Sequence, residues 1–203
     1  MMIRIFSLLA GLVLLAACNT GPQDRTPNSL GEFKLGHNVV VADKMQQGPI
    51  SRDATAEEWQ NTIKSAVQQR FGGFDGDQLY HFGISVEGYM LAPEGFIYNP
   101  RSMLVINVTV WDDAAGKKLN DKVHQITVVE DSTVSTFFKG SGRERTKQEQ
   151  MDGLTANALD QLGDWLLERH TQDGWFEKTA STAGAEDSAA TRNFTALSPA
   201  AGG

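Results

Sequence analysis

The segment from Ser102 to Trp111 constrains the fold more than any other part of the chain. It is rich in β-branched residues, and four of its apolar side chains recur at every second position: Leu104, Ile106, Val108 and Val110. Asn107 and Thr109 lie on the opposite face together with Trp111. This alternation predicts a strand with one apolar face, which must pair with other strands and be covered on that face.

Three more segments carry strand patterns. In Tyr80–Met90 the predicted buried set is Tyr80, Phe82, Ile84, Val86 and Met90. The wetter set alternating with it is His81, Gly83, Ser85, Glu87 and Tyr89. Val123–Glu130 follows a predicted hairpin turn at Asp113–Gly116, in which Gly116 suits the left-handed position. The valine run within His37–Asp43 predicts a shorter strand.

Two capping boxes mark helix starts. Thr55-Ala56-Glu57-Glu58 and Thr146-Lys147-Gln148-Glu149 both place Thr at the cap and Glu three residues later. After the first box, apolar residues follow at helical spacing: Trp59, Ile63, Ala66, Val67 and Phe71. Gly72-Gly73 should end that helix, and the second should end near His170.

The element order is therefore β-α-β-β-β-α. Three sequential strands with one apolar face need a cover, and two amphipathic helices supply it. The predicted fold is an α+β two-layer sandwich with a mainly antiparallel sheet.

The first residues have the features of a secretory signal. Arg4 contributes to a positive start, and the run Ile5–Leu15 is almost wholly apolar. At about 11 residues this run is far shorter than the ~20 needed to span a bilayer as a helix. Small residues follow it and lead to Cys18, the one cysteine of the chain.

Leu15-Ala16-Ala17-Cys18 resembles the lipobox of bacterial lipoproteins. The resemblance implies cleavage between Ala17 and Cys18, with a diacylglycerol on the cysteine thiol that ties the chain to a membrane. An ordinary secretory signal with a coincidental cysteine is the alternative. Because no second cysteine exists, the remaining fold is free of disulfides.

The predicted organisation has four parts. Residues 1–17 form the signal peptide, 18–32 the lipidated cysteine and a flexible tether, 33–177 a periplasmic domain, and 178–203 a disordered polar tail. In the lipoproteins that this sequence resembles, an Asn after the cysteine, here Asn19, does not retain the protein in the inner membrane. An outer-membrane anchor facing the periplasm is therefore expected for a Gram-negative source.

Charge excludes one class of partner. The 203-residue chain carries a formal net charge of −7. Such a chain repels nucleic acid, because binding to it depends on neutralising phosphates with basic residues. We expect no nucleic-acid partner.

Candidate catalytic and ligand-binding residues are scattered along the sequence. None of the four histidines (His37, His81, His124 and His170) is spaced with another ligand as a zinc site requires. Asp75-Gly76-Asp77 lacks most of a calcium loop and predicts a turn. The run Lys139–Arg143 lacks the glycine spacing of either phosphate fingerprint and predicts a mobile basic loop. The sequence predicts no metal, no cofactor and no catalytic residues.

Three functional hypotheses follow. The first is a non-enzymatic envelope lipoprotein that binds a protein partner, through the outer sheet face or through Phe96, Ile97 and Tyr98 in the turn Ala92–Pro100. Those three side chains could instead fold back onto the core. The second is an envelope hydrolase assembled from His81, His124, Glu87 and Asp112. The third is a module with an apolar ligand or lipid cavity between sheet and helices.

The element order is also similar to that of periplasmic lipoproteins that assist transport machines. Examples are the ABC-transport auxiliary lipoproteins and the lipopolysaccharide-assembly lipoprotein. This resemblance implies an accessory role in the envelope and carries no functional residue to this sequence.

Overall fold

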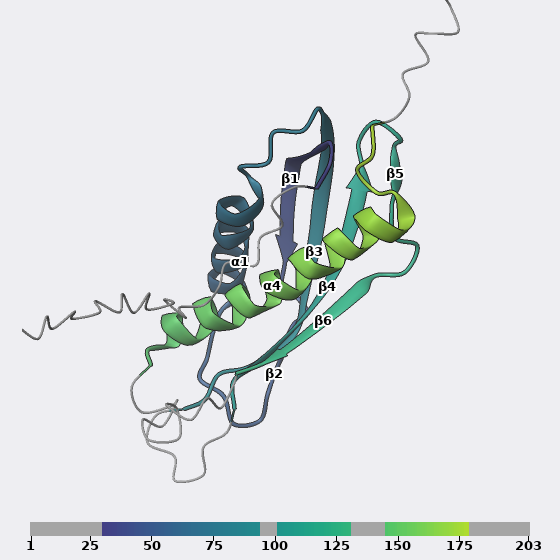
Figure 1. Ribbon diagram of the computed structural model, residues 1–203. Coiled ribbons are helices and arrows are strands. Elements are labelled where there is room, and N and C mark those ends of the chain that lie inside the picture. Colours follow the sequence, from purple (N-terminus) through teal and green to yellow (C-terminus); the bar gives the residue numbers. More distant parts are fainter. Residues whose placement is uncertain (1–29, 94–100, 131–144, 179–203) are drawn as a thin grey trace, which may run out of the picture.

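A computed structural model of the chain describes residues 30–93, 101–130 and 145–178 (Figure 1). In chain order its elements are β1 (Phe33–Val41), β2 (Gln46–Gln47), α1 (Ala56–Phe71), β3 (Gln78–Met90), β4 (Met103–Asp112), β5 (Lys117–Lys118), β6 (His124–Val129) and α4 (Lys147–Asp173). Both helices lie on one face of a six-stranded sheet in this part of the chain. The predicted α+β sandwich is confirmed.

The sheet is mixed. β3 pairs antiparallel with β4, and β4 pairs antiparallel with β6, as predicted. β1, however, pairs with β3 in parallel, with Val40 opposite Ile84. Parallel neighbours need a crossover long enough to return the chain to the same end, and α1 provides it. No pattern predicted the two-residue strands β2 and β5. β2 pairs with the last residues of β3 and β5 with the last residues of β4, at opposite ends of the sheet.

The inner face of the sheet forms the core with the helices. The predicted buried residues of β4 are at most 1% exposed. Tyr80, Phe82, Ile84 and Val86 of β3 are also buried. The hairpin turn is as predicted, with Gly116 in the left-handed region at φ 61°.

The end of β3 corrects one prediction. Its register shifts between Val86 and Gly88, so one extra residue reverses which side chains face inward. Tyr89, predicted on the wetter face, is 2% exposed, and its hydroxyl bonds to both the N–H and the carbonyl of Ala54 at 3.0 Å. Met90, predicted in the buried set, is only partly buried.

Helix α1 follows its sequence pattern closely. Thr55 and Glu58 form the predicted capping box, and Gly72 caps the other end. The stripe Trp59, Ile63, Val67 and Phe71 is at most 1% exposed and faces the sheet. Burial of such a stripe is what stabilises a helix of this length, since propensity alone leaves it marginal.

Helix α4 is longer than predicted and ends at Asp173, with Gly174 in a left-handed cap. Its capping box at Thr146 and Glu149 is formed. Three polar contacts join it to α1: Arg70 with Asp160 at 2.5 Å, Lys147 with Glu58 at 2.5 Å, and Gln148 with Thr62 at 3.1 Å. The two helices therefore form one layer.

Removing either helix cap should destabilise the protein. We expect Thr55→Ala and Thr146→Ala each to lower the free energy of unfolding by about 1 kcal/mol, because each exposes a helix amide without a partner. Urea unfolding measures this. Ser65→Ala, on the exposed side of α1, is the control and should change stability by only a few tenths of a kcal/mol. Equal losses in all three variants would contradict the capping role.

The capping carboxylates also make stability depend on pH. The side-chain bond to Lys147 and the backbone bond to Thr55 hold the pKa of Glu58 below its ordinary 4.5. The backbone N–H of Thr146 does the same for Glu149. Because folding lowers both pKa values, their contribution is complete above pH 4.5 and is lost as pH falls through the folded-state values.

The start and the end of the described fold are joined. The N–H of Glu32 donates to the carbonyl of Phe176 at 2.8 Å, and the rings of Phe33 and Phe176 lie 5.1 Å apart. Leu30 is fully buried beside them in the core. The chain therefore enters and leaves the domain at the same end of the sheet, the end that carries β5 (Figure 1).

Candidate docking surface

Several predicted site residues lie outside the described residues. These are Ala17 and Cys18 at the cleavage point, and Phe96, Ile97 and Tyr98 in the proposed contact turn. The predicted basic loop Lys139–Arg143 lies outside as well. The cleavage and lipidation site, the contact turn and the basic loop therefore stay predictions.

The four residues of the hydrolase hypothesis are not brought together. His81 lies on the sheet face away from the helices, whereas His124 lies on the helix side, stacked on Trp165. Asp112 is 8% exposed, and it accepts a side-chain bond from Gln78 and a backbone bond from the N–H of Ala115. Glu87 is exposed at the bulge. Within the described chain no group of three His, Cys, Asp or Glu residues is placed to hold a metal.

The outer face of the sheet, opposite the helices, is covered by no described element (Figure 1). Of the large apolar side chains that are well exposed, strand register assigns five to this face: Val39, Val41, Leu79, Trp111 and Val129. Their exposures are 55%, 45%, 40%, 38% and 40%. In the described chain, three other large apolar residues are exposed to a similar degree: Ile50, Val123 and Leu167. Exposed apolar surface is therefore concentrated on one face.

The centre of the outer face is small and polar. Gly83, Thr109, Ser85 and Asn107 occupy two successive cross-strand pairs there. Glycine inside a strand weakens it, and a Cβ at Gly83 would meet only Thr109, at 4.0 Å. Nothing within the described fold therefore requires glycine at this position. A backbone or side chain approaching from outside would have room there.

His81 anchors the edge of this face. Its Nδ1 accepts the backbone N–H of His37 at 2.8 Å, and its Nε2 lies 3.0 Å from Asp113 Oδ1. An acceptor Nδ1 leaves the ring proton on Nε2, which donates to Asp113. The N–H of His37 sits where the β1 register is interrupted, so the imidazole replaces a missing ladder bond.

The imidazole of His81 also explains why residue 36 is a glycine. A Cβ on Gly36 would lie 2.3 Å from His81 Nδ1. We expect Gly36→Ala to cost about 1–3 kcal/mol of stability in the presence of His81, because the ring is held from both sides. In a His81→Ala background the same change should cost distinctly less. A double-mutant cycle in urea measures the coupling, and simple additivity would show that the ring is not the obstacle.

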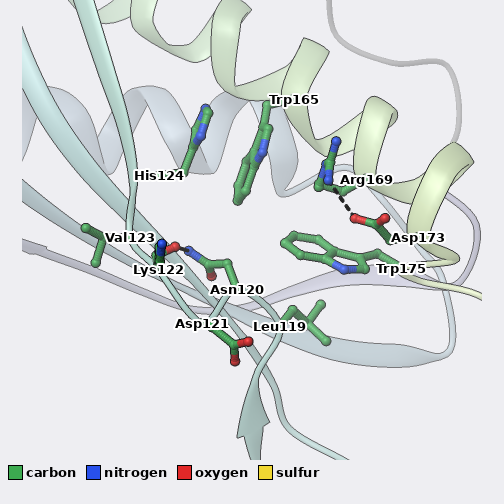
Figure 2. A pocket seen from close by; sticks show the side chains of 10 residues that line it. All are labelled: Leu119, Asn120, Asp121, Lys122, Val123, His124, Trp165, Arg169, Asp173 and Trp175. Atoms are coloured by element: carbon green, nitrogen blue, oxygen red, sulfur yellow. Dashed lines mark hydrogen bonds and ion pairs between the residues drawn. The ribbon is translucent and has the colours of Figure 1, made fainter.

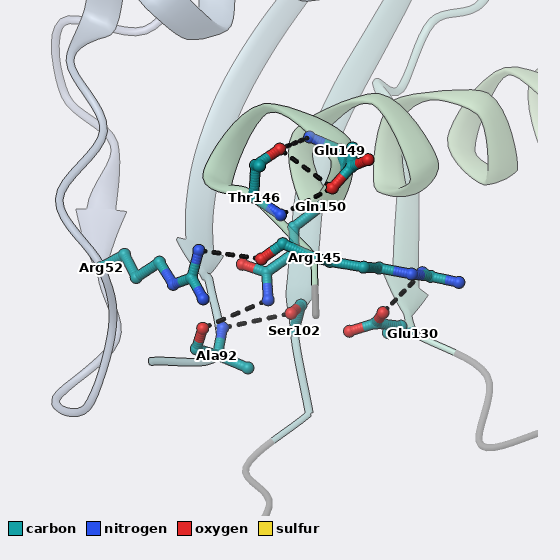
Figure 3. Close-up of polar contacts among 8 residues, drawn as sticks. All are labelled: Arg52, Ala92, Ser102, Glu130, Arg145, Thr146, Glu149 and Gln150. Atoms are coloured by element: carbon teal, nitrogen blue, oxygen red, sulfur yellow. Dashed lines mark hydrogen bonds and ion pairs between the residues drawn. The ribbon is translucent and has the colours of Figure 1, made fainter. Parts of the chain in front are cut away.

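One cluster of polar contacts brings together Ala92, Ser102, Glu130, Arg145 and Gln150 (Figure 3). The N–H of Ala92 donates to Ser102 Oγ at 3.1 Å, and the N–H of Glu130 donates to the carbonyl of Ser102 at 2.8 Å. Gln150, 1% exposed, donates to the carbonyl of Ala92, and Arg145 pairs with Glu130 at 2.7 Å. Ala92, Ser102 and Glu130 therefore meet beside the start of α4.

Open hollows occur elsewhere on the surface. One of about 520 Å³ lies between the β5–β6 connection and the end of α4, with Trp165 and Trp175 on its wall (Figure 2). Another of about 770 Å³ runs beside β1 and α1. Sequence reasoning missed the first because it assigned no face to His124. Alternation with Ile126 and Val128 would have placed that ring inward, toward α4.

The sequence matches no family model and no curated protein. Solved structures similar to it include protein XCC0632 of Xanthomonas campestris, from the family DUF330, with 14% identity over 73% of this chain and 94% of that chain and a TM-score of 0.46. The PelC dodecamer of Paraburkholderia phytofirmans is 10% identical over 65% of this chain and 89% of that chain, with a TM-score of 0.37. A minor lipoprotein of Acinetobacter baumannii is 11% identical over 67% of this chain and 93% of that chain, with a TM-score of 0.24. None of these values supports an inference about function.

Among the described residues, no helix has both the length and the apolar character needed to cross a bilayer.

Proposed function

We propose that this protein is a non-enzymatic accessory lipoprotein of the bacterial envelope. Lipid on Cys18 ties it to a membrane, with the outer membrane preferred because Asn19 follows the cysteine, and the domain faces the periplasm. Its outer sheet face binds an envelope protein. The observation that supports this most is the concentration of exposed apolar side chains on that face.

The chemistry of the face favours a protein over a lipid surface. Leu79 and Trp111 at one end and Val129 at the other supply apolar contacts. Between them, Asn107 and Thr109 offer hydrogen-bonding groups that acyl chains cannot satisfy. A protein surface can match both features, since interfaces combine an apolar core with paired polar groups.

The position of the tether suits such a role. The chain enters the domain at the end of the sheet that holds Leu30 and Phe176. β3 spans 13 residues, so the opposite end of the sheet lies about 43 Å further along at ~3.3 Å per residue. The outer face therefore extends well beyond the point of attachment and remains accessible while the lipid stays in the membrane.

Photo-crosslinking in the native host tests the proposal. A photoreactive residue at Thr109, on the outer face, should give one discrete adduct in the envelope. The same residue at Gln161, on the exposed side of α4, is the control and should give none. No adduct at Thr109, or equal adducts at both positions, would contradict the docking surface. An adduct of twice the mass of the chain would contradict a distinct partner and indicate a second copy.

A further inference from the structure

The hollow of Figure 2, here called the Trp165 hollow, has a fixed aromatic wall. Trp165 stacks on His124 with ring centroids 4.0 Å apart and planes 2° from parallel. Trp175 meets Trp165 edge-on at 5.2 Å and 83°. Three contributing segments hold these rings: the start of β6, the last turns of α4 and the loop after it. A ligand would therefore meet indoles whose orientation is set before it binds.

The rim of the hollow carries hydrogen-bonding groups of both kinds. Asp121 and Lys122 are exposed on the β5–β6 connection, and Arg169 pairs with Asp173 at 2.7 Å on the other side. Asn120 is committed to the fold, because its amide bonds to the backbone of Val108, Val110 and Lys122. The side chains of Asp121 and Lys122 therefore lie on the β5–β6 side of the hollow, and those of Arg169 and Asp173 lie on the α4 side (Figure 2).

The charges that line the hollow balance. Two carboxylates, Asp121 and Asp173, face two cations, Lys122 and Arg169. His124 adds none at neutral pH, because burial, and then the nearby Arg169, lower its pKa below the ordinary 6.5. Neither an anionic nor a cationic ligand would gain from the local field. An uncharged ligand with an apolar face and many hydroxyls suits it better.

We propose that the Trp165 hollow binds a neutral saccharide. The C–H face of a pyranose ring packs against indole, and its hydroxyls form hydrogen bonds with the charged rim groups. Because the sugar is uncharged, the balance of charges in the hollow does not change. A hollow of about 520 Å³ lies within the usual range for small-ligand sites. This inference is independent of the docking surface, which lies on the opposite side of the sheet.

Fluorine NMR of the mature lipidated protein tests the inference. The protein is labelled with 5-fluorotryptophan and held in lauryldimethylamine-oxide micelles, which contain no sugar. The chain has 4 tryptophans, so Trp59 in the core and Trp111 on the outer face serve as internal controls for Trp165 and Trp175. The probes are chitotriose, cellotriose and maltotriose, with trigalacturonate and the chitosan trimer as charged comparators.

At least one neutral trisaccharide should shift the Trp165 and Trp175 signals saturably, with a Kd of about 0.1–5 mM, and leave Trp59 and Trp111 unmoved. Asp121→Ala, at an exposed rim position, should weaken this binding about 3-fold or more. Asp152→Ala, exposed on α4 away from the hollow, should not. The inference is overturned if no neutral probe shifts these signals at about 10 mM. Tighter binding of a charged comparator, or a response at Trp111 alone, would overturn it as well.

Discussion

Phe33→Ala should lower the free energy of unfolding by about 3–5 kcal/mol, the largest loss of stability that we expect from one substitution. Phe33 is fully buried, and its ring lies 5.1–5.7 Å from those of Phe74, Tyr80, Phe82 and Phe176. It joins the first strand, the central strand and the segment after α4. Truncation removes the centre of that cluster and leaves a cavity that rigid neighbours cannot fill.

Val39→Ala is the matched control for this prediction. It lies on the same strand but is 55% exposed, so its truncation should change stability by about 0.5 kcal/mol or less. Urea unfolding followed by far-UV circular dichroism measures both. A loss at Phe33 no larger than at Val39 would show that this ring is not at the centre of the core.

Cys18→Ala should move the whole protein out of the membrane fraction. Each buried methylene of an acyl chain contributes about 0.8 kcal/mol to membrane binding, and two or more chains hold a protein essentially permanently. Without the thiol no lipid can be attached. We therefore expect at least a 100-fold change in the ratio of membrane-bound to free protein, roughly 2.7 kcal/mol.

Cell fractionation and intact mass together measure this effect. Wild-type protein from its host should begin at Cys18 and carry the added mass of its acyl groups. Ser7→Ala, within the signal segment, is the control and should leave processing unchanged. A wild-type chain that starts elsewhere or carries no acyl mass would contradict the lipid anchor.

Local signals in the sequence predicted most of the fold. Both capping boxes, the alternation of β4 and the stripe on α1 depend on residues close in sequence, and each is present as expected. The placement of Trp111 and Thr109 on the outer face followed from the same alternation. Short-range periodicity is sufficient for such features because it records which side of an element is buried.

Features that depend on partners distant in sequence were missed. The bulge before Gly88 adds a residue that no local pattern marks, so the faces of Tyr89 and Met90 were exchanged. The parallel pairing of β1 depends on how α1 packs, and the bond from His37 to His81 spans 44 residues. In the candidate site, the sequence alone does not distinguish Gly83 from any other glycine in a strand. Only the positions of its neighbours show that the fold has room for a side chain there.

The most direct test of the account compares two glycine-to-arginine variants of the full lipidated protein. Gly83→Arg places a long cation at the centre of the outer face, and Gly73→Arg adds the same group beyond α1, where a Cβ likewise meets no obstacle. Both should fold with wild-type stability to within about 1 kcal/mol. The yield of the adduct from a photoreactive residue at Thr109 is then measured in native envelopes. We predict a loss of at least 10-fold for Gly83→Arg, about 1.4 kcal/mol, and no change for Gly73→Arg. Equal yields from the two variants would contradict docking through the outer face.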